Sequence, residues 1–182
     1  YGYELLYRSG MENAYREADG DKASLSVIGN TLLVIGSQQI SQGRKVFVNF
    51  TRKLLLEGAA SYLPKEIGVI EILEDIRPDD KLIEAIKTIR SHGYLLALDD
   101  FVLHGNEYNP FLRFVDIIKV DVRETDEVER KLIAERFSGS GKVKLLAEKT
   151  ETREEFENAV QLGYSYFQGY FFCKPVILAR RD

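Results

Sequence analysis

Side chains that can hold a cation or move a proton recur at the ends of short apolar runs along this chain. They are Asn49, Glu71, Asp99 with Asp100, Lys119 with Asp121, Glu148 and Gln168. If they converge, so many carboxylates cannot all stay ionised and unpaired in one site, and a hard divalent cation such as Mg²⁺ or Mn²⁺ resolves that conflict. The chemistry this favours is hydrolysis of a phosphate ester by two metal ions.

The other residue types narrow this chemistry. The two histidines, His92 and His104, are far apart and lie outside the apolar runs, so a zinc site is disfavoured. Lys119 could orient a water or neutralise phosphate charge. It could instead form a Schiff base, but that needs a lowered pKa, whereas neighbouring carboxylates would raise it. We therefore disfavour the Schiff base.

The apolar runs alternate with helical patterns. Strands are predicted over 3–8, 46–50, 67–73, 94–100, 115–121, 143–148 and 164–168, and helices over 23–36, 51–57, 79–91, 109–112, 126–137 and 152–162. This alternation predicts a parallel sheet in an α/β fold of the TIM type, a (β/α)₈ barrel lacking one strand. The missing strand is expected upstream of Tyr1. Active sites of such barrels lie at the carboxyl ends of the strands.

Strand parity supports convergence at that rim. Side chains alternate along a strand, so residues two positions before inward-facing polar residues also face inward. Those before Asn49, Glu71, Asp99, Lys119 and Glu148 are Phe47, Val69, Ala97, Ile117 and Leu146, all apolar. This predicts an apolar layer inside the barrel beneath a polar rim. The alternative is that each charge is merely a solvated strand end.

Composition excludes several classes of protein. The 182 residues carry 25 basic and 29 acidic side chains, a net charge of −4, with 45% hydrophobic residues. A pI of about 5.4 argues against a broad basic face for a nucleic-acid polymer. No run approaches the ~18 apolar residues of a membrane span, and no secretory signal is visible. A single cysteine, Cys173, excludes an internal disulfide and is expected to be buried. One cytoplasmic domain over residues 1–182 is predicted.

Taken in order, the polar segments resemble those of the EAL domain of bacterial cyclic di-GMP phosphodiesterases. Glu4-Leu5-Leu6-Tyr7-Arg8 resembles Glu-Ala-Leu-x-Arg, Glu71-Ile72-Leu73-Glu74 is similar to Glu-Leu-Thr-Glu, and Asp99-Asp100-Phe101 to the start of Asp-Asp-Phe-Gly. Ile118-Lys119-Val120-Asp121 matches Ile-Lys-Ile-Asp, and Ala147-Glu148-Lys149-Thr150-Glu151 resembles Ala-Glu-Gly-Val-Glu. Each motif alone is weak, but their joint order is specific.

The resemblance implies roles for individual residues. The metal ligands would be Glu4, Asn49, Glu71, Asp99, Asp100 and Glu148. Lys119 and Glu148 would position the attacking water, and Glu151 and Gln168 would complete the catalytic set. Leu6 and Arg8 would contact the substrate, with Arg8 meeting a phosphate. The implied activity is Mg²⁺- or Mn²⁺-dependent opening of cyclic di-GMP to linear pGpG, in a homodimer.

One departure leaves a second function open. The family loop after the Asp pair runs Gly-Thr-Gly-Tyr-Ser-Ser, whereas residues 102–107 here read Val-Leu-His-Gly-Asn-Glu. Glu74 occupies the position that anchors this loop in the family. The alternative is therefore a weak or inactive domain that binds cyclic di-GMP and relays its occupancy to a partner domain. The wording of the motifs is most similar to EAL domains that precede an HDOD domain, which predicts such a partner.

Overall fold

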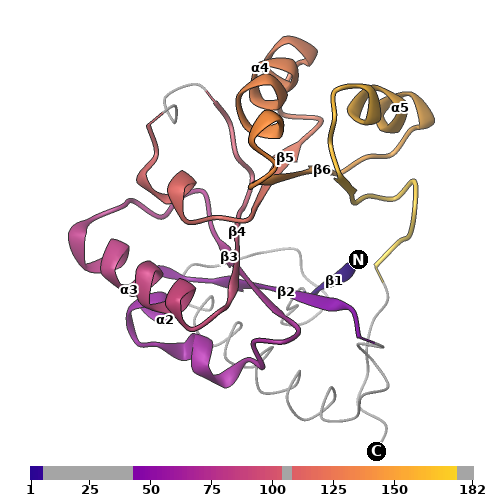
Figure 1. Ribbon diagram of the computed structural model, residues 1–182. Helices are drawn as coiled ribbons and strands as arrows, with labels where there is room; N and C mark the ends of the chain where they lie inside the picture. Colours follow the sequence, from indigo (N-terminus) through magenta and orange to yellow (C-terminus); the bar gives the residue numbers. More distant parts are fainter. Residues whose placement is uncertain (6–42, 104–107, 176–182) are drawn as a thin grey trace, which may run out of the picture.

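In the part of the chain that the structure describes, seven parallel strands form one curled sheet. The structure is a computed structural model, and it describes residues 1–5, 43–103 and 108–175. The strands are β1 (Gly2–Leu5), β2 (Lys45–Phe50), β3 (Gly68–Ile72), β4 (Leu95–Leu98), β5 (Ile117–Asp121), β6 (Lys144–Glu148) and β7 (Tyr166–Phe167). Their order in the sheet is their order in the chain, and every neighbouring pair is parallel (Figure 1). This confirms the predicted TIM-like α/β fold.

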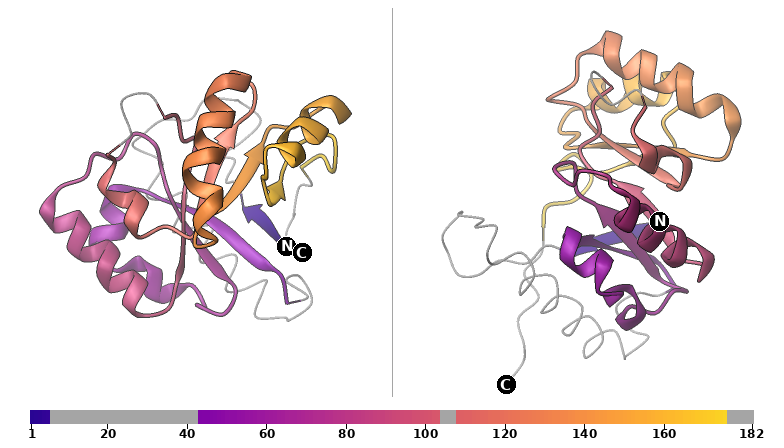
Figure 2. Two further views of the ribbon diagram at one scale, coloured as in Figure 1. Left: turned by 45° about the horizontal axis from the view of Figure 1, so that its top comes forward. Right: turned by 90° about the vertical axis from the view of Figure 1, so that its left-hand side faces the viewer.

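Helices cover the outer side of this sheet, as Figures 1 and 2 show. They are α2 (Arg52–Leu56), α3 (Asp80–Ser91), α4 (Glu127–Phe137) and α5 (Arg153–Gln161), with 3₁₀ turns at Ala59–Tyr62, Pro110–Arg113 and Ser138–Ser140. Thr51, Asp79, Asp126 and Thr152 cap these four α-helices of the described residues, each accepting a hydrogen bond from the first turn. The predicted helix 109–112 is a 3₁₀ turn, and the predicted helix 23–36 lies outside the described residues.

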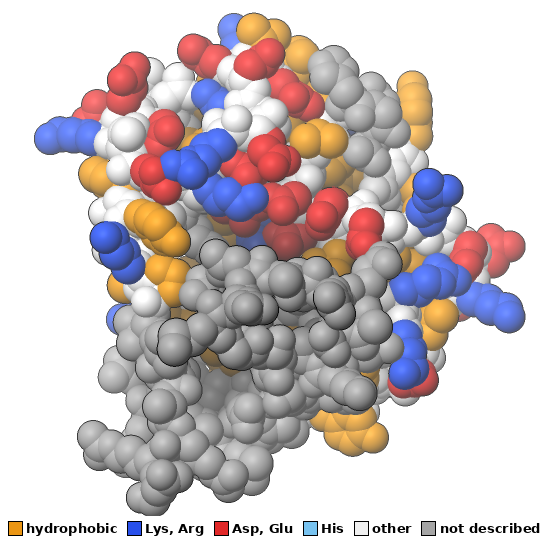
Figure 3. Space-filling view, turned by 180° about the vertical axis from the view of Figure 1, so that it is seen from behind, with side chains coloured by type: hydrophobic (Ala, Val, Ile, Leu, Met, Phe, Trp, Pro, Cys, Tyr) orange, Lys and Arg blue, Asp and Glu red, His pale blue; other side chains and the backbone are white. Residues whose placement is uncertain are grey.

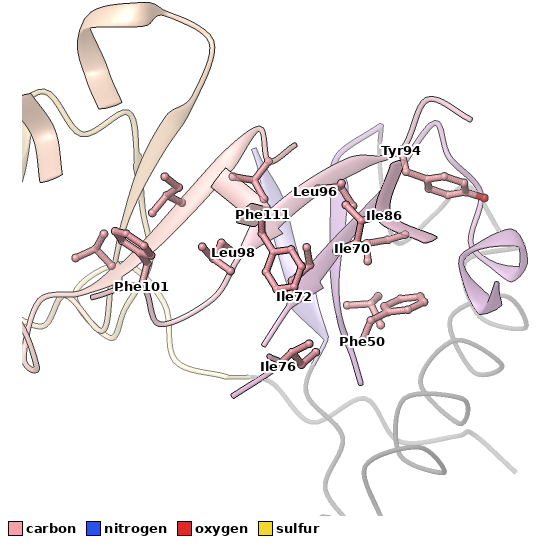
Figure 4. Close-up of a cluster of buried hydrophobic side chains, with 14 of the residues drawn as sticks. Phe50, Ile70, Ile72, Ile76, Ile86, Tyr94, Leu96, Leu98, Phe101 and Phe111 are labelled. Atoms are coloured by element: carbon pink, nitrogen blue, oxygen red, sulfur yellow. The ribbon is translucent and has the colours of Figure 1, made fainter. Parts of the chain in front are cut away.

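The larger core lies between the sheet and the helices. Outward-facing strand residues such as Phe50, Ile72 and Leu98 pack there with Ile86 of α3 and Phe111 (Figure 4). The hydroxyl of Tyr94, at the edge of this core, donates to the Leu63 carbonyl at 2.8 Å. Burial of this many apolar side chains holds each strand firmly between its neighbours and the helices, so the strand ends are fixed in position.

A second, smaller core fills the inner side of the sheet. It consists of Phe47, Val69, Ala97, Ile117 and Leu146, with Leu95 and Tyr166 packed against it. These five are the inward apolar layer that parity predicts. Tyr1 stacks on Tyr166 with ring centroids 4.3 Å apart, so side chains next to the first strand and on the last strand meet across the interior. The sheet therefore curls far enough to bring the carboxyl ends of its strands around one opening, which we call the mouth.

Candidate active site

The strand register brings the predicted polar residues to one face of the sheet. Asn49 pairs with Glu71, Lys119 with Leu146, and Asp121 with Glu148. Parallel partners share a face, so these side chains all point inward, above the small inner core. Backbone bonds beyond the strands hold the ends in place: Asp99 N–H donates to Ile72 O at 3.0 Å, and Gln168 N–H to Ala147 O at 2.8 Å. Figure 3 shows Asp and Glu side chains gathered on one face of the molecule.

Lys119 is the centre of this cluster. Its ammonium group lies 2.7 Å from Glu71 Oε1, 2.5 Å from Asp99 Oδ1, 3.3 Å from Glu148 Oε2 and 3.4 Å from Glu4 Oε2. The Lys119 side chain is buried, as are those of Glu71 and Glu148. Burial alone would disfavour the ammonium ion, but the surrounding carboxylates raise the pKa of Lys119 well above its ordinary value. Lys119 therefore stays cationic, which excludes a Schiff-base amine.

The buried carboxyl groups bind protons more tightly than ordinary ones. Burial raises the pKa of Glu71 to about 8, although Lys119 acts in the opposite sense. Burial also raises the pKa of Glu148 to about 9, and the neighbouring Asp99 carboxylate adds to this rise. Burial likewise raises the pKa of Asp99. One ammonium group does not compensate for so many buried carboxylates, so the site is short of positive charge.

Several buried oxygens of this cluster lack a hydrogen-bond partner. Among the described residues, Asn49 Oδ1, Glu71 Oε2 and Glu148 Oε1 are inaccessible to solvent and accept no hydrogen bond. Buried polar atoms in folded proteins are normally satisfied, so this group indicates a missing ligand. Carboxylate and amide oxygens are the donors that Mg²⁺ and Mn²⁺ prefer. The residues present therefore fit a hard divalent cation.

A second group of oxygens lies further out. Carboxylate oxygens of Glu74, Asp99 and Asp100 lie within 4.8 Å of one another. Burial would raise the pKa of Asp100, but a hydrogen bond from Glu148 and the ammonium group of Lys149 hold it below its ordinary value. Asp99 belongs to both groups, so the inner and outer oxygens form one continuous mouth.

A scan against family models matches residues 23–175 to the EAL domain. The chain belongs to the EAL domain family. It is 42% identical over 185 residues to the uncharacterised protein YuxH of Bacillus subtilis, and 38% identical over 182 residues to the cyclic di-GMP phosphodiesterase CdgJ of Vibrio cholerae. The alignments cover 99% of this chain but 45% and 42% of those proteins, so the chain spans less than half the length of these relatives.

Solved structures share the fold of this EAL domain. One is the Bacillus subtilis YkuI protein in complex with cyclic di-GMP and calcium, with a TM-score of 0.70 and 20% identity. That match covers 98% of this chain and 53% of YkuI. At this level of identity the likeness establishes the fold, a TIM-like barrel with the strand ends at a common mouth.

The EAL-domain structure brings most predicted site residues together. Glu4, Asn49, Glu71, Asp99, Asp100, Lys119, Glu148 and Gln168 all lie at the mouth. Gln168 Nε2 donates to Glu4 Oε2 at 2.5 Å and so orients that carboxylate. Glu151 differs, because its carboxylate pairs with Arg123 at the surface. The predicted substrate residues Leu6 and Arg8 lie outside the described residues.

Lys149 at the mouth was absent from the predicted site, and Asp121 was named among the polar residues that end the strands but was given no role. Asp121 lies on the inward face of β5, and Lys149 follows β6 directly; their side chains form an ion pair. Lys149 stands where the EAL pattern has glycine, and that difference was the available signal. Glu74 lies beside Asp99 and Asp100. Its predicted role as anchor of the following loop stays a prediction, since residues 104–107 of that loop are outside the described ranges.

Proposed function

We propose that this EAL domain is a divalent-cation-dependent phosphodiesterase that opens cyclic di-GMP to linear pGpG. The observation that carries the proposal is the buried Lys119 surrounded by four carboxylates, next to buried oxygens without a hydrogen-bond partner. CdgJ is named a cyclic di-GMP phosphodiesterase, and 99% of this chain aligns with part of it. YkuI is described with that nucleotide and calcium.

The inner residues would hold the cation and the attacking water. Glu4, Asn49, Glu71 and Asp99 would bind Mg²⁺ or Mn²⁺, with Asp100 and Glu148 completing the ligand set. Bound cations would supply charge stabilisation of the phosphoryl oxygens and a more acidic water. Glu148, 3.3 Å from the Lys119 ammonium group, would lose its own proton when the cation binds and would then accept the proton of that water.

Supporting residues would fix this arrangement. The Lys119 ammonium group contacts Glu4, Glu71 and Asp99 as well, and its fixed positive charge opposes their mutual repulsion. Gln168 orients Glu4 through its side-chain amide. A mouth this rich in carboxylates repels a phosphodiester unless cations neutralise it, so nucleotide binding would also require the cation. Arg8 and Leu6 stay predicted substrate contacts.

The test is turnover of cyclic di-GMP by the purified chain with Mn²⁺ or Mg²⁺, followed by chromatography of the product. We expect pGpG to form, chelation to stop the reaction, and Glu148→Gln to lower kcat by about 10²-fold or more. Glu135→Gln, an exposed position on α4, is the matched control and should leave kcat unchanged. Turnover that survives both chelation and Glu148→Gln would rule this mechanism out.

A second candidate function is binding without hydrolysis, with the occupancy relayed to a partner domain. The observation in its favour is Lys149, whose ammonium group lies 3.2 Å from Asp100 Oδ1 and so occupies a predicted metal ligand. Calorimetric binding of cyclic di-GMP, with no product after hours at saturating Mn²⁺, would favour this function over catalysis.

The remaining sequence-based expectations are also proposals. Homodimerisation and an adjoining HDOD domain rest on the family resemblance, and a cytoplasmic location rests on the composition of the sequence. The helices in the described part of the chain include none with the length and apolar character needed to cross a membrane.

A further inference from the structure

Two residues at the mouth have an unusual backbone conformation and contact each other. Asp100 has a φ of +39° and Lys149 a φ of +57°. Among the residues that the structure describes, these are the non-glycine positions with positive φ. They follow different strands, β4 and β6, yet Lys149 Nζ lies 3.2 Å from Asp100 Oδ1. Left-handed backbone is unfavourable for residues with a Cβ, so the surroundings must hold both residues in place.

Lys149 connects two carboxylates. Besides Asp100, its ammonium group pairs with Asp121 Oδ2. Asp121 is itself fixed, because its Oδ1 accepts hydrogen bonds from the backbone N–H groups of Arg123 at 2.7 Å and Glu124 at 3.3 Å. The Lys149 side chain remains 46% exposed, whereas that of Asp121 is 5% exposed. The lysine can therefore leave its position more easily than the carboxylate that it contacts.

The position of Lys149 matters because Asp100 belongs to the outer oxygen group. The oxygens of Glu74, Asp99 and Asp100 lie within 4.8 Å of one another, and Asp99 Oδ1, which is shielded from solvent, lies 2.5 Å from the Lys119 ammonium group. A cation bound there must share Asp100 with the Lys149 ammonium group or displace it. The inner oxygens of Asn49 and Glu71 are different, since Lys149 forms its ion pairs in the described part of the chain with Asp100 and Asp121.

We propose that Lys149 is an internal competitor for the outer cation: it occupies Asp100 while that cation is absent and weakens its binding relative to the inner cation. Lys149 is thus a positioning residue for Asp100. The inference rests on the proposed function in one respect, because it requires that the mouth bind divalent cations. Its consequence is unequal loading, so that the inner cation binds at a lower metal concentration than the outer one.

The test is calorimetric titration of the full chain with Mn²⁺ alone, without nucleotide. For the wild type we expect two binding events of unequal affinity. Lys149→Gln removes the charge and should tighten the weaker event by about tenfold, the scale of two partly exposed ion pairs, while changing the stronger event by less than about twofold. Lys149→Arg keeps the charge and should resemble the wild type.

The matched control is Lys87→Gln, which removes one exposed lysine that is paired with Glu84 on α3, away from the mouth. It should change neither event. Should Lys149→Gln fail to fold, Lys149→Gly supplies the same readout, since glycine adopts positive φ without strain.

Four results would overturn the inference. Two concern Lys149→Gln: an unchanged affinity of the weaker event, or equal tightening of both events. The other two are tightening in Lys87→Gln and a single Mn²⁺ event in every variant. Turnover of cyclic di-GMP is measured separately. A domain that shows the expected Mn²⁺ titrations but forms no pGpG would retain this role of Lys149 and reject hydrolysis.

Discussion

Lys119 and Glu71 form an ion pair 2.7 Å long in which neither side chain is more than 1% exposed. The pair lies directly above the inner apolar layer, at the base of the mouth. Water cannot compensate either charge at such a position, so each group depends on its protein neighbours. Removing one partner should therefore cost more than removing both.

The first prediction concerns Lys119→Met. It leaves the Glu71, Asp99 and Glu148 carboxyl groups without their common cation, so we expect a loss of about 3 kcal/mol in the unfolding free energy of the metal-free protein at pH 8. Urea denaturation measures it. The double variant Lys119→Met/Glu71→Gln should be less destabilised than Lys119→Met alone. A double variant at least as destabilised as Lys119→Met alone would contradict the dependence of these two side chains on each other.

The second prediction is the pH dependence of stability without metal. Folding raises the pKa of Glu71 to about 8 and of Glu148 to about 9, from ordinary values near 4.5. A carboxyl with a raised folded-state pKa favours folding below its unfolded pKa, and this contribution is lost as pH rises through the folded value. The melting temperature of the metal-free protein should therefore fall between pH 5 and pH 9, by about 5 °C or more.

Mn²⁺ should oppose this fall. Metal ligands must lose their protons, so the stabilisation by a fixed excess of Mn²⁺ should grow over the same pH range. Glu148→Gln imitates the protonated side chain and should flatten the metal-free profile, whereas the exposed Glu135→Gln should not. Differential scanning calorimetry at several pH values tests the fall in the metal-free protein, the opposing effect of Mn²⁺ and the flatter profile of Glu148→Gln. A metal-free melting temperature that rises from pH 5 to pH 9 would contradict the assignment.

The sequence predicted the mouth because the fold is regular there. A parallel sheet places residues of equal parity on one face, so the apolar layer of Phe47, Val69 and Ala97 and the polar rim above it followed from alternation. Lys119 was correctly expected among carboxylates, and the retained charge agrees with the rejection of a Schiff base. These inferences needed only the strand period and the barrel rule.

Features outside the sheet were not predictable in this way. Cys173 was expected to be buried, but it is exposed, because it lies beyond β7 in a segment without regular structure. The pairing of Glu151 with Arg123 and of Lys149 with Asp100 depends on loop backbone. Loop conformation is set by tertiary contacts rather than by a repeating period, so hydrophobic patterning carries no signal for it.

The third prediction separates strain from charge at Lys149. Lys149→Ala removes the ion pairs but keeps a Cβ at a φ of +57°, whereas Lys149→Gly removes the ion pairs and the Cβ. Lys149→Gly should therefore be more stable than Lys149→Ala by about 1 kcal/mol in urea denaturation. Equal stability of the two variants would show that the left-handed backbone stores no strain.

The fourth prediction concerns Gly169, which follows the site residue Gln168. Its φ is +154°, and a Cβ added there would lie 2.0 Å from the carbonyl oxygen of Thr150 and 2.4 Å from its nitrogen. These are backbone atoms that hydrogen bonds hold in place: Thr150 N–H donates to Gln168 O at 3.0 Å, and Phe171 N–H donates to Thr150 O at 3.1 Å. No side-chain rotation can relieve the overlap.

Gly169→Ala should therefore separate the end of β7 from the segment after β6 and move Gln168 away from Glu4. We expect a loss of about 3 kcal/mol in unfolding free energy, together with reduced Mn²⁺ affinity. Gly163→Ala is the matched control: its φ is +90°, but the nearest atom, in Ser138, is 3.9 Å from the added Cβ. It should lose only about 1 kcal/mol, the strain of left-handed backbone, with Mn²⁺ affinity unchanged. Equal losses in the two variants would mean that the close approach of Gly169 to Thr150 does not position the site.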